Sequence, residues 1–327
     1  MVQTTSAQTA PFVPAASLSP ARRPGSFRRF LPAYLMCAPT IILFLVFMVF
    51  PIVFVIYTSL LNWDGIGSVL RADFIGLDNY HRLVSDDIWW RAVRNTVLYA
   101  VLKVVIELPL ALLIALVLSS GLRGVVAIRT IAFLPVITSI AVVSLAFTFF
   151  FSPIGGPFNT VLVNLGWLDR PIAWLGERDT AFWTVTGVAI WHDLGINMVF
   201  FLAALQTVPR DLYDAAMVDG AGAWQRFRNI TIPTIRPLTA VILTLSLSGS
   251  LKVFDIFAVM TGGGPAFSTT TMVLYMFKYT AFGGGGLGGA QTTPAVGYGS
   301  SIAIGLGLVI FAFILVQQWI NRLQDRG

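Results

Sequence analysis

Six long apolar segments constrain the fold of this chain more than any other feature. They cover residues 31–61, 95–119, 126–151, 181–206, 237–260 and 300–321. A helix needs about 20 apolar residues to cross a hydrocarbon core ~30 Å thick, and inside that core its backbone polar groups must bond within the segment. The apolar runs are continuous, as from Ile41 to Phe47, whereas a membrane β-barrel needs alternating segments. We therefore predict an all-α polytopic membrane protein with six transmembrane helices.

The composition excludes several other classes of protein. Only 11% of the 327 residues are charged and the mean hydropathy is +0.80, whereas a soluble domain carries about 25% charged residues. This excludes a soluble domain, a disordered chain and a nucleic-acid-binding protein. Cys37 is the only cysteine, which excludes a disulfide framework.

The arginines predict the orientation of the chain in the bilayer. The short loop at 119–129 carries Arg123 and Arg129 and no acidic residue, and cytoplasmic loops are enriched in basic side chains. Both termini are therefore expected to be cytoplasmic. We expect four parts, which are a disordered cytoplasmic tail at 1–29, the first transmembrane helix and its outer loop at 30–94, a membrane core at 95–322 and a cytoplasmic C-terminus at 323–327.

The loop at 209–233 follows the fourth apolar segment and is cytoplasmic in this orientation. Apolar residues at helical spacing lie on both sides of Gly220, which predicts two short helices joined at a glycine bend. Pro233 is expected to end the second of them. On periodicity alone, an ordinary amphipathic loop at the membrane interface is an equal alternative.

The order of residues in this loop resembles the EAA loop of ABC importer permeases. That pattern is Glu-Ala-Ala, then Asp-Gly-Ala, then Phe, Ile and Pro at set spacing. The corresponding residues here are Asp214 in place of the usual glutamate, Ala215, Ala216, Asp219, Gly220, Ala221, Phe227, Ile230 and Pro233. The stretches 74–80 and 261–265 are similar to outer-loop signatures of the carbohydrate-uptake branch. They resemble those of the larger maltose permease and the first glycerol-phosphate permease subunit.

The resemblance implies a permease subunit that forms half of the translocation path for a sugar. The implied partners are a second homologous permease subunit, two copies of a cytoplasmic ABC ATPase and an extracytoplasmic substrate-binding protein, around the inner membrane of a bacterial or archaeal cell. All the loop residues above except Ile230 are the expected ATPase-coupling contacts. The chain contains no Gly-x-x-x-x-Gly-Lys-Ser/Thr phosphate loop. ATP and Mg²⁺ are therefore expected on the ATPase, no cofactor is expected on this chain, and the chain is expected not to be an enzyme.

Polar residues inside the spans are candidates for contact with a ligand. By resemblance to the maltose permease, the substrate path comprises His192, Asp193, Ile196, Ser246, Gly249, Ser250 and Val253. Hydroxyl, amide and carboxylate groups beside an apolar platform suit a sugar. The alternatives are that the two serines only allow close helix packing and that His192 is an interior hydrogen-bonded group.

Four further ionisable residues lie within the spans. Lys103 and Glu107 are four residues apart on one helix face and are expected to neutralise each other. Lys252 either favours an anionic ligand, such as a glycerol-phosphate ester, or pairs with Asp255.

Two other functions stay open on sequence alone. An ion-coupled secondary transporter could use Asp193, Lys252 and Asp255, but it would show an internal repeat with interrupted helices, and no repeat is visible. A membrane-embedded enzyme has no recognisable motif here. The two histidines, His81 and His192, are far apart and no cysteine pair exists, so no metal site is expected.

Overall fold

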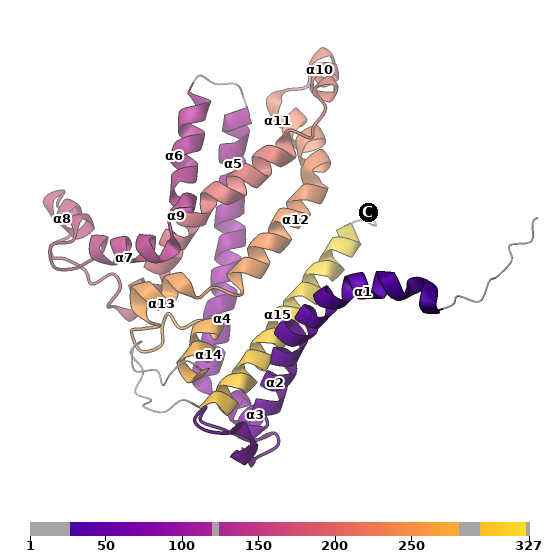
Figure 1. The fold of residues 1–327 in the computed structure, drawn as a ribbon. Helices are drawn as coiled ribbons and strands as arrows, with labels where there is room; N and C mark the ends of the chain where they lie inside the picture. The colour runs from indigo at the N-terminus through magenta and orange to yellow at the C-terminus, as the bar shows by residue number, and fades with distance from the viewer. Residues whose placement is uncertain (1–26, 120–123, 281–294, 325–327) are drawn as a thin grey trace, which may run out of the picture. The chain divides into compact units, whose positions relative to one another are not determined.

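The structure is a computed structural model that describes residues 27–119, 124–280 and 295–324. This part of the chain is mostly helical, with one two-stranded sheet (Figure 1). Five helices are long and apolar enough to span a membrane, or six when one bent pair counts as a single span. The prediction of an all-α polytopic membrane protein is confirmed.

The chain divides into two compact units, residues 1–52 and 53–327. The first unit carries α1 (Phe27–Phe44) and the π-helical turn η1 (Leu45–Val49), which runs on into α2 (Phe50–Thr58). Pro39 lies inside α1 and does not interrupt that helix. Of the predicted tail, residues 1–26 lie outside the described residues and 27–29 begin α1.

In the second unit, which begins within α2, a small sheet follows that helix. Strand β1 (Leu61–Asn62) pairs antiparallel with β2 (Asp73–Phe74), and the 3-10 turn η2 (Val69–Arg71) lies between them. Helix α3 (Asp78–Val84) follows. The Asn79 amide donates to the carbonyls of Ser59 at 2.9 Å and Leu61 at 3.0 Å, which holds α3 against β1.

The second span consists of α4 (Asp87–Leu102), the π-helical turn η3 (Lys103–Glu107) and α5 (Leu108–Ser119). It begins at Asp87 rather than at residue 95. The Asp86 carboxylate caps the helix by accepting from the amide of Ile88 at 2.9 Å, which satisfies a donor that the first helical turn leaves unpaired.

The third span differs from the prediction of one continuous helix over 126–151. It consists of α6 (Val125–Ile137) and α7 (Ile140–Phe150), which meet at an angle of 96°. Thr138 is extended between them, with φ −82° and ψ 137°. Pro135 lies in the last turn of α6 and supplies no amide hydrogen to the helix. Helix α8 (Pro157–Asn164) follows α7.

The remaining elements contain the fourth, fifth and sixth spans. They are α9 (Arg178–Leu205), α10 (Arg210–Val218), α11 (Ala223–Arg226), the π-helical turn η4 (Phe227–Thr231), α12 (Ile232–Ser250), α13 (Asp255–Thr261), α14 (Met272–Thr280) and α15 (Val296–Gln324). The predicted fifth helix at 237–260 is interrupted at residues 251–254. The glycine-rich segment at 283–290 and residues 325–327 lie outside the described residues.

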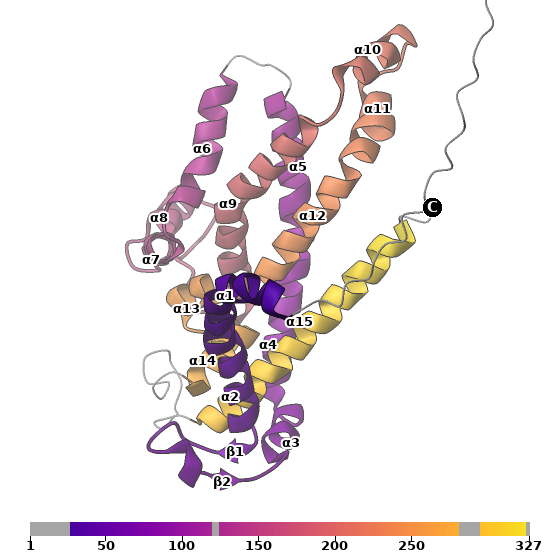
Figure 2. The same ribbon diagram turned by 45° about the vertical axis from the view of Figure 1, so that its right-hand side comes forward.

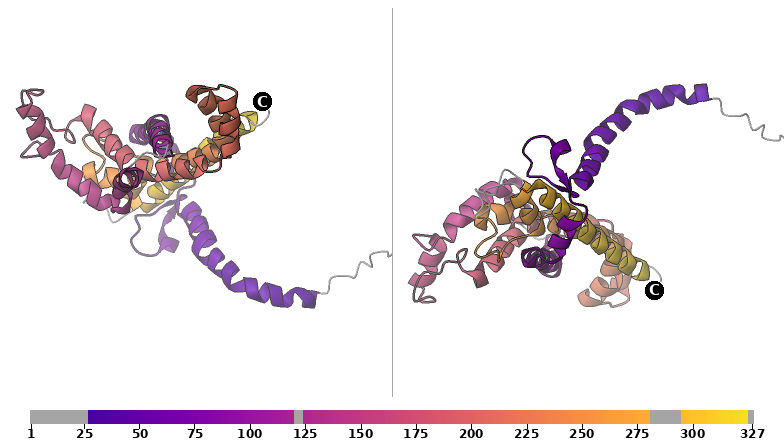
Figure 3. Two further views of the ribbon diagram at one scale, coloured as in Figure 1. Left: turned by 90° about the horizontal axis from the view of Figure 1, so that it is seen from above. Right: turned by 90° about the horizontal axis from the view of Figure 1, so that it is seen from below.

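Helix α9 is the centre of the second unit. It packs against α5, α6 and α12, and Figures 1 and 2 show these helices side by side. Seen from above and from below in Figure 3, α7 and α8 lie on one side of this group, and α10 and α11 lie on another. Gly195 allows α6 to approach α9, because a Cβ atom there would lie 2.4 Å from the Ala132 carbonyl oxygen. This contact places the break between α6 and α7 next to the middle of α9.

Candidate functional site

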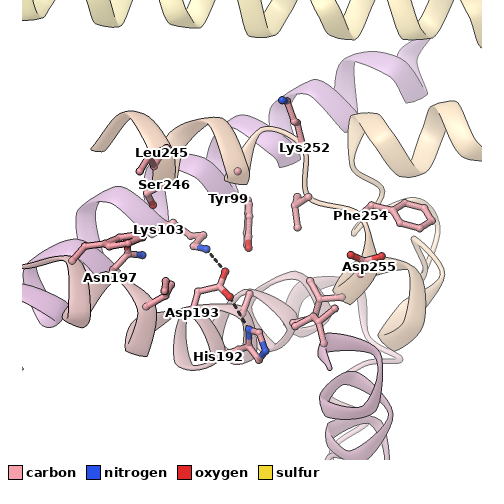
Figure 4. A pocket seen from close by; sticks show the side chains of 17 residues that line it. Tyr99, Lys103, His192, Asp193, Asn197, Leu245, Ser246, Lys252, Phe254 and Asp255 are labelled. Carbon is pink, nitrogen blue, oxygen red and sulfur yellow. Dashed lines mark hydrogen bonds and ion pairs between the residues drawn. The ribbon is translucent and has the colours of Figure 1, made fainter. Parts of the chain in front are cut away.

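A cavity of about 450 Å³ lies between the middle of α9, the α4–η3 junction, the first turn of α7 and the break between α12 and α13 (Figure 4). Six of the seven predicted path residues line it, namely His192, Asp193, Ile196, Ser246, Gly249 and Val253. Ser250 does not line it. Its side chain is buried and its hydroxyl donates to the Ser246 carbonyl at 2.7 Å, so it stays against its own helix.

A network of ionised side chains forms one wall of the cavity. Lys103 forms a salt bridge with Asp193 on α9 and lies 3.3 Å from Oε2 of Glu107 on its own helix. Asn197 donates a hydrogen bond to the other carboxylate oxygen of Glu107. The expected pairing of Lys103 with Glu107 is confirmed, and the structure adds Asp193 as a second counter-ion.

His192 joins this network to the broken third span. Its Nδ1 lies 2.6 Å from Oδ1 of Asp193, and its Nε2 lies 3.3 Å from the carbonyl oxygen of Thr138. The ring lies between a carboxylate and a carbonyl at the α6–α7 break, and in its neutral form it donates to one of these two acceptors. This geometry fixes the imidazole against the cavity wall.

Three further polar side chains that line the cavity are left for a ligand. The Ser246 hydroxyl is buried and has no hydrogen-bond partner in the described part of the chain. Lys252 and Asp255 also line the cavity, and neither forms a salt bridge with any residue that the structure describes. Figure 4 shows the Lys252 amine pointing away from Asp255, so the pairing left open by the sequence is not formed.

Sequence reasoning did not identify several other lining residues. These are Tyr99, Ile140, Ala189, Asn197, Phe200, Leu245, Phe254 and Ile256. Helical spacing contains a signal for two of them. Asn197 lies four residues after Asp193, and Tyr99 lies four residues before Lys103, so each shares a helix face with an ionised residue.

The loop at 209–233 forms two short helices, α10 and α11, as its apolar spacing predicted. Gly220 adopts φ +78° at the bend, a left-handed conformation that side chains other than glycine rarely adopt. The predicted coupling residues lie on this exposed element. Asp214, Ala215, Asp219, Gly220 and Pro233 are exposed, whereas Ala216, Ala221, Phe227 and Ile230 are partly buried.

Pro233 does not end the second helix, which corrects the prediction. The chain runs from α11 through the π-helical turn η4 directly into α12, where Pro233 occupies the first turn. Pro233 supplies no amide hydrogen to this continuous helix, and the π-helical turn η4 lies directly before it.

The chain resembles several known proteins. Residues 92–327 match the family model described as "Binding-protein-dependent transport system inner membrane component". The chain is 34% identical to the lactose transport system permease protein LacF of Rhizobium radiobacter, over 88% of this chain and 93% of that protein. It is also 34% identical to the sulfoquinovosyl glycerol transport system permease protein SmoG of Agrobacterium fabrum, over 90% of this chain and 92% of that protein.

A solved structure of an ABC transporter is also similar to this chain. The chain aligns with a bacterial alginate ABC transporter, solved with an alginate pentasaccharide-bound periplasmic protein, at a TM-score of 0.76 and 26% identity. The alignment covers 90% of this chain and 95% of that chain. These comparisons favour an ATP-driven importer over the ion-coupled transporter and the membrane-embedded enzyme that the sequence left open. The chain belongs to the family of binding-protein-dependent transport system inner membrane components, as a permease subunit of an ABC importer.

Proposed function

We propose that this chain forms half of a translocation path for a saccharide, with the cavity between α4, α9 and the α12–α13 break as its midpoint. The observation that carries the proposal is the set of free polar groups on the cavity wall, which are the Ser246 hydroxyl, Lys252 and Asp255. A saccharide offers hydroxyl groups that match such groups, and Tyr99 and Phe254 supply aromatic surface beside them. Gly249 adds room, because a Cβ atom there would meet nothing within 4 Å.

An aromatic cluster lies beside the central cavity, on the side away from α10. The ring centroids of Tyr99 and Phe257 are 5.4 Å apart, and those of Phe182 and Phe257 are 5.9 Å apart. Tyr99 also lines the cavity at the midpoint, and Phe182 lines a separate cavity of about 300 Å³ beyond the cluster. In the orientation that the arginines predict, with both termini cytoplasmic, this cluster lies on the outer side of the central cavity. Rearrangement of the cluster would open the path to a ligand delivered by a binding protein.

The helices α10 and α11 are proposed to couple this rearrangement to an ATPase. Their exposed residues include Asp214 and Gly220, at positions that match the EAA pattern. The proposed partners are a second homologous permease, two ATPase copies that bind ATP and Mg²⁺, and an extracytoplasmic binding protein. The second short helix is continuous with α12. A movement of the loop is thereby transmitted to the helix that carries Ser246.

An anionic saccharide fits the charges along the path better than a neutral one. Lys252 has no counter-ion among the described residues, and Arg91, Arg94 and Arg178 line the outer cavity with Asp179 as its acidic residue. The transport systems of the relatives carry both kinds of ligand by name, lactose and sulfoquinovosyl glycerol. A glycerol-phosphate ester is the second candidate, and it is favoured by the same unpaired lysine.

Transport by the complete importer in proteoliposomes tests the proposal. Uptake of radiolabelled lactose and sulfoquinovosyl glycerol is measured with and without internal ATP. We expect ATP-dependent uptake that an uncoupler leaves unchanged, with sulfoquinovosyl glycerol preferred. Asp214→Lys and Gly220→Pro are expected to abolish uptake and coupled ATP hydrolysis while the chain still inserts into the membrane. Normal uptake in both variants would reject the coupling role, and uptake of neither probe would reject the proposed ligand class.

A further inference from the structure

A second large cavity lies at the end of the helix group that carries α10 and α11, and its volume is about 950 Å³. Its wall combines the last turn of α5, the last turns of α9 and residues of α6, α10, α11 and η4. It shares no lining residue with the cavity at the midpoint of the path. The proposed saccharide path therefore does not account for it.

The charge of this cavity is one-sided. Arg129 of α6, Arg210 of α10 and Arg226 of α11 line it, and none of its lining residues is acidic. In the described ranges, none of these three guanidinium groups forms a salt bridge or a hydrogen bond. Three unpaired guanidinium groups around one hollow attract an anion with several oxygen atoms, because each planar fork donates two parallel hydrogen bonds to phosphate.

The rest of the wall combines apolar side chains with four polar ones, Ser119, Gln206, Tyr213 and Thr231. Leu116, Leu202, Leu205 and Phe227 face the same hollow as the arginines. The exposed Gln206 adds an amide group at the end of α9. A ligand for this cavity therefore combines an anionic head with hydrocarbon.

The position of the cavity relative to the membrane indicates that such a ligand is a lipid. Two membrane-spanning helices end at it, α5 at Ser119 and α9 at Leu205, so it lies where hydrocarbon gives way to headgroups. Basic pockets between transmembrane helices at the cytoplasmic surface bind anionic lipid headgroups. We propose that this cavity binds the phosphate headgroup of an anionic phospholipid, with its acyl chains along the leucine wall.

Bound lipid would link the coupling loop to the membrane helices. Arg210 and Arg226 lie on the two short helices of the loop, whereas Arg129 lies on α6, which packs against α9. One phosphate held by all three would tie the loop to α6 and limit its movement relative to the bundle. The consequence for coupling rests on the proposed role of the loop, whereas the lipid site does not.

Lipid binding by the complete importer tests the site directly. The purified complex is placed in nanodiscs of phosphatidylcholine with or without phosphatidylglycerol, and native mass spectrometry counts the phosphatidylglycerol that remains bound. A titration with short-chain phosphatidylglycerol gives the affinity. Because one basic side chain near a membrane contributes about fivefold to anionic lipid binding, we expect Arg129→Gln with Arg226→Gln to weaken it roughly 25-fold. Arg226→Lys should lose less than Arg226→Gln, since it keeps the charge.

Arg228→Gln is the matched control, because Arg228 is an exposed arginine two residues further along and does not line the cavity. Equal loss in this control, or unchanged affinity in the double variant, would overturn the proposal. Saturable binding of inorganic phosphate in phosphatidylcholine discs, at the affinity of the lipid, would assign the site to a soluble anion instead and also overturn it. Loss of the ATPase from the double variant with unchanged lipid binding would assign the arginines to acidic groups of that partner. A melting temperature equal to that of the wild-type complex shows that a loss of lipid does not reflect unfolding.

Discussion

Lys103 of η3 and Asp193 of α9 form a salt bridge that joins the second and fourth spans beside the central cavity. Glu107 lies against the same ammonium group, and its side chain is fully buried, whereas that of Asp193 is 36% exposed. The lysine therefore shares one positive charge between a buried carboxylate and a carboxylate that lines the cavity. Replacement of this lysine therefore affects both carboxylates.

Lys103→Met is expected to destabilise the protein by about 3–5 kcal/mol, because it leaves a buried carboxylate without its counter-ion. The triple variant Lys103→Met, Glu107→Gln and Asp193→Asn removes the charges together and should recover most of the loss. The measurement is the thermal unfolding midpoint of the purified complex in detergent. Lys252→Met is the control, since Lys252 is exposed and unpaired among the described residues, and it should change stability by less than about 0.5 kcal/mol. A triple variant no more stable than Lys103→Met would contradict the pairing.

Gly249→Leu is expected to reduce the uptake rate about tenfold with little change in stability. A tenfold change in rate corresponds to about 1.4 kcal/mol in the barrier to transport. The added side chain meets open space and extends into the cavity of about 450 Å³. Gly307→Leu is the matched control. It makes the same substitution on α15, where a Cβ atom also meets nothing within 4 Å. Initial uptake rates in proteoliposomes measure the effect, and equal rates in the two variants would show that the cavity is not on the path.

The number and type of the spans followed from the sequence because hydrocarbon imposes one rule on every residue inside it. The two interruptions did not follow, because each depends on a partner far along the chain. His192 lies at hydrogen-bond distance from the carbonyl of Thr138 at the first break, and the hydroxyl of Thr271 donates to the carbonyl of Val253 at the second, at 3.0 Å. No local pattern around either break indicates that its backbone groups will be satisfied from elsewhere.

The candidate site, like the fold, could be predicted from the sequence only in part. The path residues that the sequence proposed on α9 and α12 by resemblance to the maltose permease line the cavity, with the exception of Ser250. Ser250 does not line it, although it lies four residues after Ser246. It is the last residue of α12 before the break, and its hydroxyl bonds back to the Ser246 carbonyl instead of entering the cavity. Tyr99 was missed although it lies four residues before Lys103 on the same helix face.

Gly195→Val is expected to destabilise the protein by about 1–3 kcal/mol or more, because overpacking forces the backbone to shift. A Cβ atom at this position would lie 2.4 Å from the Ala132 carbonyl oxygen and 3.1 Å from the Cα atom of Phe133. Helix α6 would have to move away from α9. Gly187→Val is the control on the same helix, because a Cβ atom there meets nothing within 4 Å. Size-exclusion chromatography after heating separates the two outcomes, and equal loss in both variants would exclude close packing at Gly195 as the cause.

Asp86 lies directly before the second span, where it joins three helices and makes stability depend on pH. It caps α4 and accepts hydrogen bonds from the hydroxyls of Tyr275 on α14 and Tyr298 on α15, each at 2.5 Å. Burial alone would raise the pKa of this carboxyl. The hydrogen bonds from the two tyrosines and from the amides of Ile88 and Trp89 favour the charged form more strongly, so the pKa is lowered from its usual value of 3.8.

A folded-state pKa below that of the unfolded chain means that the ionised group stabilises the fold above about pH 3.8. This contribution is lost as the pH falls through the folded-state pKa. Asp86→Ala should therefore lower stability near neutral pH, by about 1–2 kcal/mol for the lost helix cap alone, and the difference from the wild type should shrink as the pH falls below 4. Asp87→Ala is the neighbouring control, because Asp87 is exposed and is not the cap. Unfolding midpoints measured across this acid range give the difference, and a gap between wild type and Asp86→Ala that stays constant down to the lowest pH would contradict the assigned role of the carboxylate.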